Sequence, residues 1–430
     1  MPRFTLRLSA TDDVPAAEAT SSFYWLNDQR SSFTAGVGPN LEQLGAVPPL
    51  NVDVVRIALT ALSADRSVLR EGRGSNWNQR QLDLEIPVSD SAAWSSAADE
   101  LARVLGFLSG DRWTLSFTQQ EHTTTVTPAG ADPVPQRVVL LSGGADSAIG
   151  GLISRSLLAE GERHVLLSHY SSTVLAPIQR HIASELARLI PGPDQRHTVV
   201  HIGRRSERID GSPYPSEPTT RSRSLLFLAL GLAVAAIHKI PLWIPENGFA
   251  SINPPLGPER LGSLSTRTTH PKFLQDLTTV LAKIGAHAVI ENPFAHTTKG
   301  EMYNQVVDLV GPVEASAFLS ATHSCALSGQ WTHGISPGRP CGICFGCVLR
   351  RASFAASGVT DRSNYIAPNS EPAVKKWLDS KSVEQPVRSF IHRGIRMRDL
   401  AALSLPTDYP LRDAFDLCQR GIQELRSLYP

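Results

Sequence analysis

The stretch Val138-Val-Leu-Leu141 followed by Ser142-Gly-Gly-Ala-Asp-Ser147 decides the fold of the central part of this chain. The four apolar residues predict a buried strand, the glycine pair predicts a tight turn, and Ala148–Leu158 predicts a helix. A helix that begins directly after such a turn offers unpaired backbone amides and roughly half a positive charge to an anion. The stretch therefore predicts a phosphate-binding loop in an α/β fold.

Each residue type in this loop suits a phosphate site. The two glycines allow close approach of the backbone, the serine hydroxyls can donate hydrogen bonds, and Asp146 can cap the helix or hold a phosphate-bound Mg²⁺. The loop is neither a Walker A loop nor a Gly-x-Gly-x-x-Gly loop. A plain turn with Asp146 as an ordinary cap is the alternative. The predicted nucleotide-binding residues are Ser142, Gly143, Gly144, Ala145, Asp146 and Ser147.

Composition and charge narrow the functional classes. The 430 residues exceed one typical core, and 41% of them are hydrophobic and 19% charged, as in soluble globular proteins. A formal net charge of +1 gives no electrostatic case for direct nucleic-acid binding. The apolar stretch Leu225–Ile237 is too short to span a bilayer, and the N-terminus lacks the apolar stretch of a signal peptide. We expect a cytoplasmic protein, because three of the five cysteines are clustered and a disulfide framework would spread them.

Residues 1–136 are expected to form a small α+β domain of unknown role. Leu82–Ile86 alternates as a half-buried strand does, Val54–Leu62 is predicted as another strand, and Asp90–Leu108 predicts an amphipathic helix. The proline-rich segment Pro128–Pro135 is predicted as a linker to the next domain.

Residues 137–360 are expected to form the second domain, and residues 361–430 a helical C-terminal extension without an interpretable motif. Short apolar runs separated by helix-sized intervals predict a parallel sheet with helices on both faces. These runs are Val138–Leu141, Val165–Leu167, Val199–Ile202, Leu242–Ile244 and Ala288–Ile290.

Three cysteines lie within seven residues, as two overlapping Cys-x2-Cys spacings at Cys341, Cys344 and Cys347. This spacing lets a tight turn present thiolates to one tetrahedral ion. Cys325 is the first candidate for the fourth ligand, and His323 and His333 are the alternatives. Spacing alone leaves zinc and an iron–sulfur cluster open.

The six-residue loop matches the signature of the PP-loop ATP pyrophosphatases, which cleave ATP between the α and β phosphates. Together with the cysteine cluster it resembles one family, the 7-cyano-7-deazaguanine synthases (QueC), over roughly Val138–Phe354. Five markers occur in the order typical of that family: Ser142–Ser147, Arg223–Leu230, Glu246–Gly248, Thr298–Glu301, and Cys325 with Cys341–Arg350. The implied fold is a Rossmann-like adenine nucleotide α-hydrolase domain with a zinc knuckle.

This resemblance implies that a 7-deazaguanine carboxylate is adenylated and then converted to an amide and a nitrile, which makes the chain an ATP-dependent C–N ligase. The implied cofactors are ATP, Mg²⁺ and a structural Zn²⁺ held by Cys325, Cys341, Cys344 and Cys347. Asp146 would support Mg²⁺, and Lys299 and Arg223 would offset charge on the phosphates.

The chain also departs from the family. Arg221-Ser-Arg-Ser224 replaces the usual Pro-Gly-Arg-Asn, and Ile252–Leu256 and Ser265–Pro271 replace the usual substrate-reading stretch. With its extra terminal blocks the chain is similar to QueC-like subunits of bacterial antiphage operons such as Qat. That similarity implies partner proteins from the same operon, one of which would supply the acceptor amine.

Three further residues, Asn247, Arg267 and His270, are candidate substrate contacts. Loop capping is the alternative for Arg267 and His270, because Thr-rich turns of this kind often need a cap. Two other functions stay open from the sequence: a tRNA-modifying PP-loop enzyme, and a nucleotide-binding scaffold without catalysis.

Overall fold

The computed structural model describes residues 1–11, 13–70, 79–121, 133–170, 174–256, 267–326 and 338–430. The N-terminal elements are β1 (Arg3–Arg7), α1 (Ala16–Ser21), β2 (Ser22–Tyr24), β3 (Phe33–Ala35), the 3₁₀ helix η1 (Glu42–Leu44), α2 (Pro49–Ser67), β4 (Gln81–Val88), α3 (Ser91–Ser96), α4 (Ala98–Ser109) and β5 (Arg112–Gln119).

The central elements are β6 (Val138–Leu140), α5 (Ala145–Ser156), β7 (Arg163–Tyr170), α6 (Leu175–Leu189), β8 (Asp194–Arg204), α7 (Arg223–His238), β9 (Leu242–Trp243), α8 (Gly248–Ser251), α9 (Pro271–Lys283), β10 (Ile290–Glu291), α10 (Lys299–Val310), α11 (Pro312–Ser320) and α12 (Phe345–Ser357). The C-terminal elements are α13 (Pro372–Lys381), α14 (Glu384–Arg393), the 3₁₀ helix η4 (Met397–Leu403) and α15 (Leu411–Leu428).

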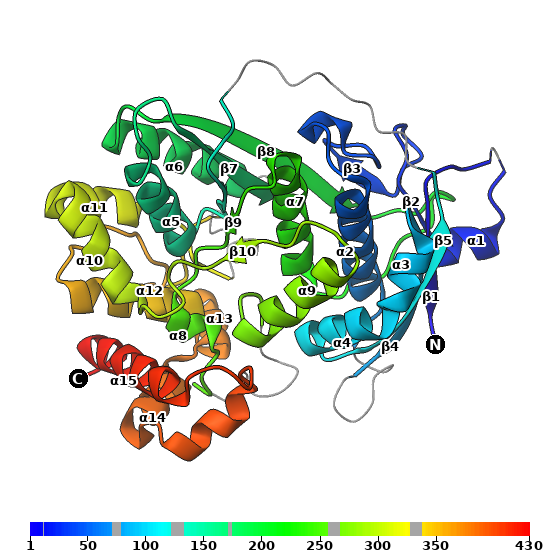
Figure 1. Cartoon of the computed structure of the whole chain (residues 1–430). Helices are drawn as coiled ribbons and strands as arrows, with labels where there is room; N and C mark the ends of the chain where they lie inside the picture. Colours follow the sequence, from blue (N-terminus) through cyan, green and yellow to red (C-terminus); the bar gives the residue numbers. More distant parts are fainter. Residues whose placement is uncertain (12, 71–78, 122–132, 171–173, 257–266, 327–337) are drawn as a thin grey trace.

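The central sheet has the strand order β10-β9-β6-β7-β8-β3, and every neighbouring pair is parallel except β3 with β8. Alternate residues of β6 enter different cores, as the two-residue period of a strand requires. Val138 and Leu140 pack in the core that contains α7 and α2, whereas Val139 and Leu141 pack in the core that contains α5, α6 and α10 (Figure 1). The predicted parallel α/β fold with helices on both faces is confirmed.

The N-terminal part shares its core with the central sheet. Strand β3 pairs antiparallel with β8, with Phe33 opposite Arg204, and so extends the central sheet. The other N-terminal strands form a second, parallel sheet of order β2-β1-β4-β5. Helix α2 lies between the two sheets, and its Val55 belongs to the same hydrophobic core as Leu84 of β4 and Leu228 of α7 (Figure 1). The domain boundary at residue 136 stays a prediction, and most of the predicted linker lies outside the described residues.

The strand predicted at Val54–Leu62 is wrong, because this segment is the middle of the 19-residue helix α2. Pro49 occupies the first turn, where a missing amide costs nothing. Nearly every side chain from Asn51 to Ser67 is buried, so the helix is covered by protein around most of its circumference. A short, fully buried apolar run looks alike in a strand and in a helix, and only its length separates the two.

The predicted helical character of the last block is present in α13, α14 and α15, with a 3₁₀ helix at Met397–Leu403. Helix α15 packs in one core with α8, α12 and α14, where Leu417 lies with Phe249 and Leu349. Across the parts of the chain that the structure describes, we find no helix both long and apolar enough to cross a membrane.

Candidate active site

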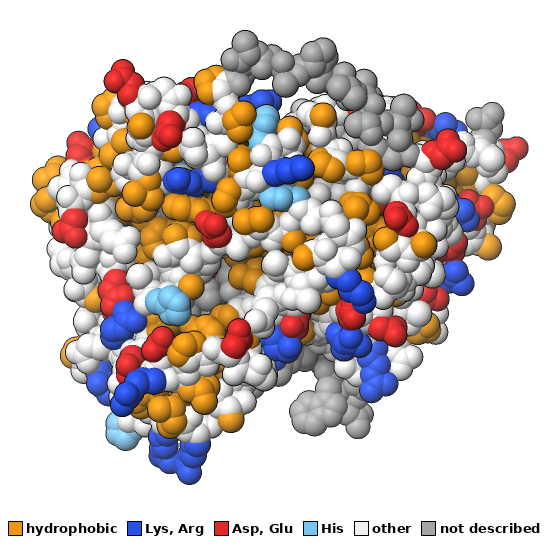
Figure 2. Space-filling view, viewed as in Figure 1, with side chains coloured by type: hydrophobic (Ala, Val, Ile, Leu, Met, Phe, Trp, Pro, Cys, Tyr) orange, Lys and Arg blue, Asp and Glu red, His pale blue; other side chains and the backbone are white. Residues whose placement is uncertain are grey.

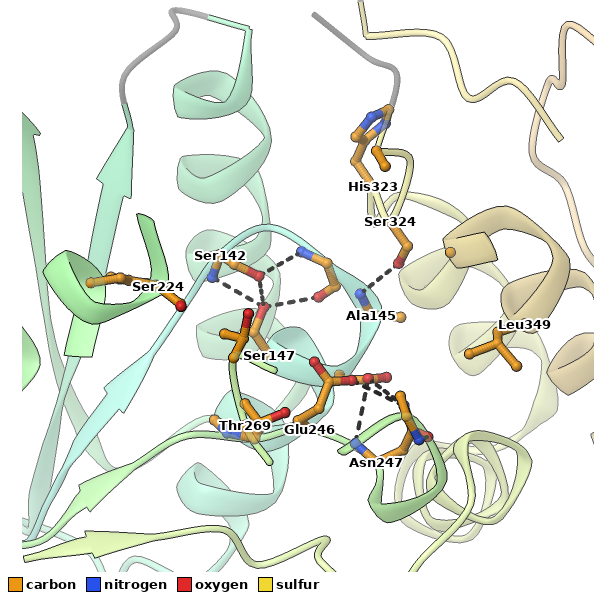
Figure 3. A pocket seen from close by; sticks show the side chains of 18 of the residues that line it. Ser142, Ala145, Ser147, Ser224, Glu246, Asn247, Thr269, His323, Ser324 and Leu349 are labelled. Atoms are coloured by element: carbon orange, nitrogen blue, oxygen red, sulfur yellow. Dashed lines mark hydrogen bonds between the residues drawn. The ribbon is translucent and has the colours of Figure 1, made fainter. Parts of the chain in front are cut away.

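The predicted phosphate loop joins β6 to α5 at the carboxyl edge of the sheet (Figure 3). Helix α5 begins at Ala145 with Gly144 as its N-cap residue, so the first amides of the helix follow the glycine pair. Gly143 has a φ of +94°, which an L side chain adopts only with strain. The second glycine has an ordinary φ of −78°. Only the first of the two is therefore demanded by backbone conformation.

Serine hydroxyls hold the loop in shape. The Ser147 hydroxyl accepts a hydrogen bond from the Ser142 amide at 3.1 Å and donates one to the Gly144 carbonyl at 3.0 Å. The Ala145 amide donates to the hydroxyl of Ser324, 3.3 Å away and distant in sequence. The Ser324 hydroxyl thus accepts from the first amide of the helix, where an anion would bind.

Asp146 points away from the loop toward two partners from later segments. Lys299 Nζ lies 2.7 Å from Asp146 Oδ1, and Asn247 Nδ2 donates to Oδ2 at 2.9 Å. Burial raises the pKa of this carboxyl, but the Lys299 ammonium and the hydrogen bonds outweigh burial and lower it to about 2. Asp146 is therefore an anion at every physiological pH.

Lys299 is the first residue of α10, and its position follows from the local sequence. The N-cap residue Thr298 and Glu301 form a capping box, with the Thr298 amide donating to Glu301 Oε2 at 2.8 Å. Only 8% of the Lys299 side chain is exposed. Burial lowers the pKa of its ammonium, yet Asp146 more than offsets this and leaves the pKa raised. Lys299 therefore carries its positive charge.

These residues line one cavity of about 560 Å³. The phosphate loop, Arg223, Asn247 and Lys299 all contribute to its wall, so the structure brings together every predicted catalytic residue. The Arg223 side chain is exposed and lines the cavity. The surrounding protein lowers the pKa of its guanidinium, and no described carboxylate raises that pKa again. In Figure 3, Ser224 lies on the opposite side of the loop from Glu246 and Asn247, so the loop is flanked by α7 and by the α8 turn.

Arg267 and His270 flank Thr268 and Thr269 of the cavity wall, but their own side chains have partners outside it. His270 is the N-cap residue of α9, where Nδ1 accepts from the Lys272 amide at 3.2 Å and Nε2 lies 2.8 Å from the Leu403 carbonyl. Arg267 donates to the Phe107 carbonyl at 3.2 Å and lies over the Phe107 ring. Neither residue is among those that line the cavity. His270 thus caps a helix, as the alternative interpretation of this residue predicted. A substrate contact by Arg267 or His270 stays a prediction.

The four predicted cysteine ligands form a cluster that could bind zinc. Their Sγ atoms all lie within 4.8 Å of one another. The Cys341–Cys347 and Cys344–Cys325 Sγ separations are 3.8 and 3.9 Å, and a tetrahedral ZnS₄ site with Zn–S bonds of about 2.3 Å requires about 3.8 Å. Hydrogen bonds from the other thiols, from Cys325 first, lower the pKa of Cys344. His323 is not part of the cluster, and His333 lies outside the described residues.

The cysteine cluster also supports the phosphate loop. His323, two residues before Cys325, donates its backbone amide to the Gly143 carbonyl at 2.8 Å, and Ser324 accepts from Ala145 as above. Buried Arg350 of α12 donates to the Thr322 and Leu319 carbonyls at 2.8 and 2.9 Å. A metal that fixes the cluster would therefore fix one side of the loop.

The sequence did not identify several residues of the cavity wall. His169 at the end of β7 and Thr220 before α7 line the cavity, and both also line an adjoining cavity of about 420 Å³. That second cavity is walled partly by Arg66 of α2, so the N-terminal part contributes to it. Parallel strands end at one sheet edge, and this rule could have selected His169. Nothing in the local sequence marks Thr220 or Arg66.

Comparison with known proteins gives one consistent result. The chain is 27% identical over 252 residues to a 7-cyano-7-deazaguanine synthase of Cupriavidus metallidurans, which covers 54% of this chain and 98% of that protein. It is 26% identical to the Myxococcus xanthus synthase over 54% of this chain and 98% of the relative, and 29% identical to the Cupriavidus necator synthase over 54% and 97%. No protein-family model matches the chain. About half of the chain is thus similar to QueC proteins, as the motifs predicted.

Proposed function

We propose that this chain is an ATP-dependent enzyme that adenylates the carboxylate of a 7-deazaguanine. The observation that carries this proposal is that the phosphate loop, Lys299 and Arg223 line one cavity. Similarity to the 7-cyano-7-deazaguanine synthases supports the choice of acid. The N-terminal part contributes residues to the wall of the adjoining cavity, and helix α15 of the C-terminal part packs in one core with α8 and α12.

In the first step a carboxylate oxygen attacks the α-phosphorus of ATP, the α–β phosphoanhydride bond breaks, and pyrophosphate leaves. Pyrophosphate carries the charge that develops, so cations placed beside it lower the barrier. The amides at the start of α5 would hold pyrophosphate, and Lys299 and Arg223 would offset its charge. No protein nucleophile is required, because positioning two bound reactants supplies much of the rate.

The wall of the cavity also suits a magnesium ion. Asn247 Nδ2 donates to Asp146 at 2.9 Å and to Glu246 Oε1 at 3.0 Å, so one amide brings two carboxylates together. Mg²⁺ prefers such oxygen ligands and usually binds through one or two carboxylates and substrate phosphates. We propose that Asp146 and Glu246 hold Mg²⁺, which when bound would neutralise phosphate charge.

In the second step an amine attacks the acyl carbon, AMP leaves, and the amine loses a proton to give an amide. We propose that this amine belongs to a partner protein of an antiphage operon, as the likeness to QueC-like Qat subunits implies. With ammonia as acceptor, activation of the amide by a second ATP would give the nitrile. Intact-mass analysis of co-expressed operon proteins decides between them: a deazaguanine adduct supports the protein amine, and free nitrile as the sole product overturns it.

The activation step is tested by pyrophosphate release from ATP in the presence of 7-carboxy-7-deazaguanine. We expect release by the wild type and a loss on the order of 100-fold in Asp146→Asn, which keeps the side-chain size but removes the charge. Asp276→Asn is the matched control, because Asp276 forms a surface ion pair with Lys272. Equal rates in wild type and Asp146→Asn would overturn the proposed role of the loop.

The zinc site is tested by metal analysis of purified variants. We expect one zinc ion per wild-type chain, almost none in Cys344→Ser, and slower pyrophosphate release because Ser324 and His323 lose their support. Cys418→Ser is the control, since Cys418 is a single buried thiol within α15. Zinc retained in Cys344→Ser, or iron in place of zinc in the wild type, would contradict the assignment.

A further inference from the structure

The C-terminal helix α15 contacts the two segments that supply the partners of Asp146. Asn247 directly precedes α8, and Lys299 is the first residue of α10. These two segments are far apart in the chain, and α15 begins more than a hundred residues after Lys299. Helix α15 lies next to α8 and α12 (Figure 1), and none of its residues lines the cavity.

On the α10 side, the Glu424 carboxylate caps the turn that carries Lys299. Its two oxygens accept from the Gly300 amide at 2.9 and 3.0 Å, and its Oε1 also accepts from the Thr298 hydroxyl. A Cβ at Gly300 would lie 2.5 Å from Glu424 Oε1, so a side chain there would displace the carboxylate. Both neighbours of Lys299 in the chain are therefore fixed by one residue of α15.

Arg420, one helical turn before Glu424, holds the same turn from its other side. Its guanidinium donates to both carboxylate oxygens of Glu301 and to the His296 carbonyl at 2.9 Å. Both contacts to Glu301 come from Nη1, so one charged nitrogen is shared between the two carboxylate oxygens, and such charge-assisted hydrogen bonds are stronger than neutral ones. Glu301 is the residue that completes the capping box at the start of α10.

On the α8 side, α15 approaches closely enough that only glycine fits. A Cβ at Gly421 would lie 2.4 Å from Phe249, the second residue of α8. Leu417 packs against Gly248, where a Cβ would lie 2.9 Å from its Cδ2. Helix α8 starts from Asn247, whose side chain accepts from the Ala250 amide at 2.8 Å and donates to Asp146.

We propose that α15 is a positioning element of the active site, in which Glu424 fixes the Thr298–Gly300 turn and so holds Lys299 against Asp146 and the cavity. The role is one of positioning, because Glu424 contacts backbone and hydroxyl groups of the turn. Misplacing a charged group by a fraction of an ångström weakens its contact with developing charge in the transition state. The inference rests on the proposed function, since Lys299 is assigned there to pyrophosphate.

A double-mutant cycle between Glu424 and Lys299 tests the proposal. Glu424→Gln keeps the shape of the side chain and one acceptor oxygen but removes the charge. We expect it to lower kcat for pyrophosphate release about tenfold with a smaller change in KM for ATP. In a Lys299→Ala background the same substitution should change kcat less than twofold, because its effect passes through Lys299.

Two controls separate positioning from general stability. Asp416→Asn removes an exposed carboxylate from the same helix and should leave kcat unchanged. Thermal unfolding of all variants measures their stability separately. A loss of stability alone would not depend on whether Lys299 is present. Equal losses in kcat in both backgrounds, or no loss in the Glu424→Gln single variant, would overturn the positioning role.

Failure of the proposed function would look different. A wild type that binds ATP without releasing pyrophosphate would overturn the proposed reaction, and the same cycle is then measured in the Kd for ATP. If Glu424→Gln weakens ATP binding when Lys299 is present but not in the Lys299→Ala background, the positioning role of Glu424 is still supported. Equal losses of affinity in both backgrounds would overturn it.

Discussion

Two buried clusters of opposite charges differ in how completely their charges are paired. In the N-terminal part, Asp65 and Asp111 are held by Arg70 and Arg80, with separations of 2.6 to 3.3 Å for three of the four pairs. Asp65 Oδ2 also accepts from the Arg221 and Ser222 amides at 2.7 and 3.0 Å.

In the second cluster, Asp146 pairs with the Lys299 ammonium and accepts from the side-chain and backbone amides of Asn247 at 2.9 and 3.5 Å. No described carboxylate offsets the lowered pKa of Arg223, which lines the same cavity. This cluster opens into the cavity. Both carboxylates of the first cluster are paired with arginines inside the protein, which indicates a structural role for them. The first cluster ties α2 to the segment that starts α7, and thereby sets where Arg223 enters the cavity.

The largest effect is expected from Asp65→Asn. Two buried arginines would lose a shared carboxylate, and breaking a buried pair costs about 3–5 kcal/mol. Urea denaturation measures the free energy of unfolding, and Asp308→Asn, at an exposed position of α10, is the control with a change below about 0.5 kcal/mol. A loss below about 1 kcal/mol in Asp65→Asn would contradict the structural role of the first cluster.

Lys299→Ala should act mainly on catalysis. We expect pyrophosphate release to fall on the order of 100-fold, because a cation placed against developing charge is lost. Lys272→Ala is the matched control, since Lys272 also pairs with an aspartate at 2.8 Å but on the surface. An unchanged rate in Lys299→Ala, measured with saturating ATP, would make the second cluster structural like the first.

The acid dependence of stability should reveal the Asp146–Lys299 pair. The folded-state pKa of Asp146 is lowered from 3.8 to about 2, so its contribution is present above pH 3.8 and is lost as pH falls through about 2. The shift corresponds to about 2 kcal/mol. The difference in unfolding free energy between wild type and Asp146→Asn should shrink by that amount from pH 5 to pH 2. A constant difference across this range would contradict a charged, paired Asp146.

The smallest effect concerns the glycine that turns the phosphate loop. Gly143→Ala and Gly161→Ala both place a Cβ at positive φ, +94° and +82°, and each should cost about 1–2 kcal/mol of stability. Only Gly143→Ala should also weaken ATP binding, because Gly143 belongs to the phosphate loop. Gly161 lies in a turn where an added Cβ would meet no other atom within 4 Å. Equal ATP affinities for the two variants would show that the loop does not take part in nucleotide binding.

Local sequence patterns predicted the elements whose physics is local. The buried strand at Val138–Leu141, the helix after the glycine pair and the Cys-x2-Cys spacing depend on residues close in the chain, and all three are present. Helix α5 begins at Ala145, three residues before the predicted start at Ala148. The wrong prediction at Val54–Leu62 also comes from reliance on a local pattern. A segment buried on all sides lacks the hydrophobic periodicity that distinguishes a helix from a strand.

The sequence by itself determined the glycine turn after β6, the parallel sheet and the two Cys-x2-Cys spacings, since each follows from neighbouring residues. Only the tertiary structure decided that Asn247 and Lys299 both hold Asp146, that Ser324 closes the loop, and that Glu424 caps the turn of Lys299. These contacts join residues far apart in the chain, and their geometry depends on how helices pack rather than on spacing. For the same reason His270, which follows a Thr-rich turn, caps α9 outside the cavity wall.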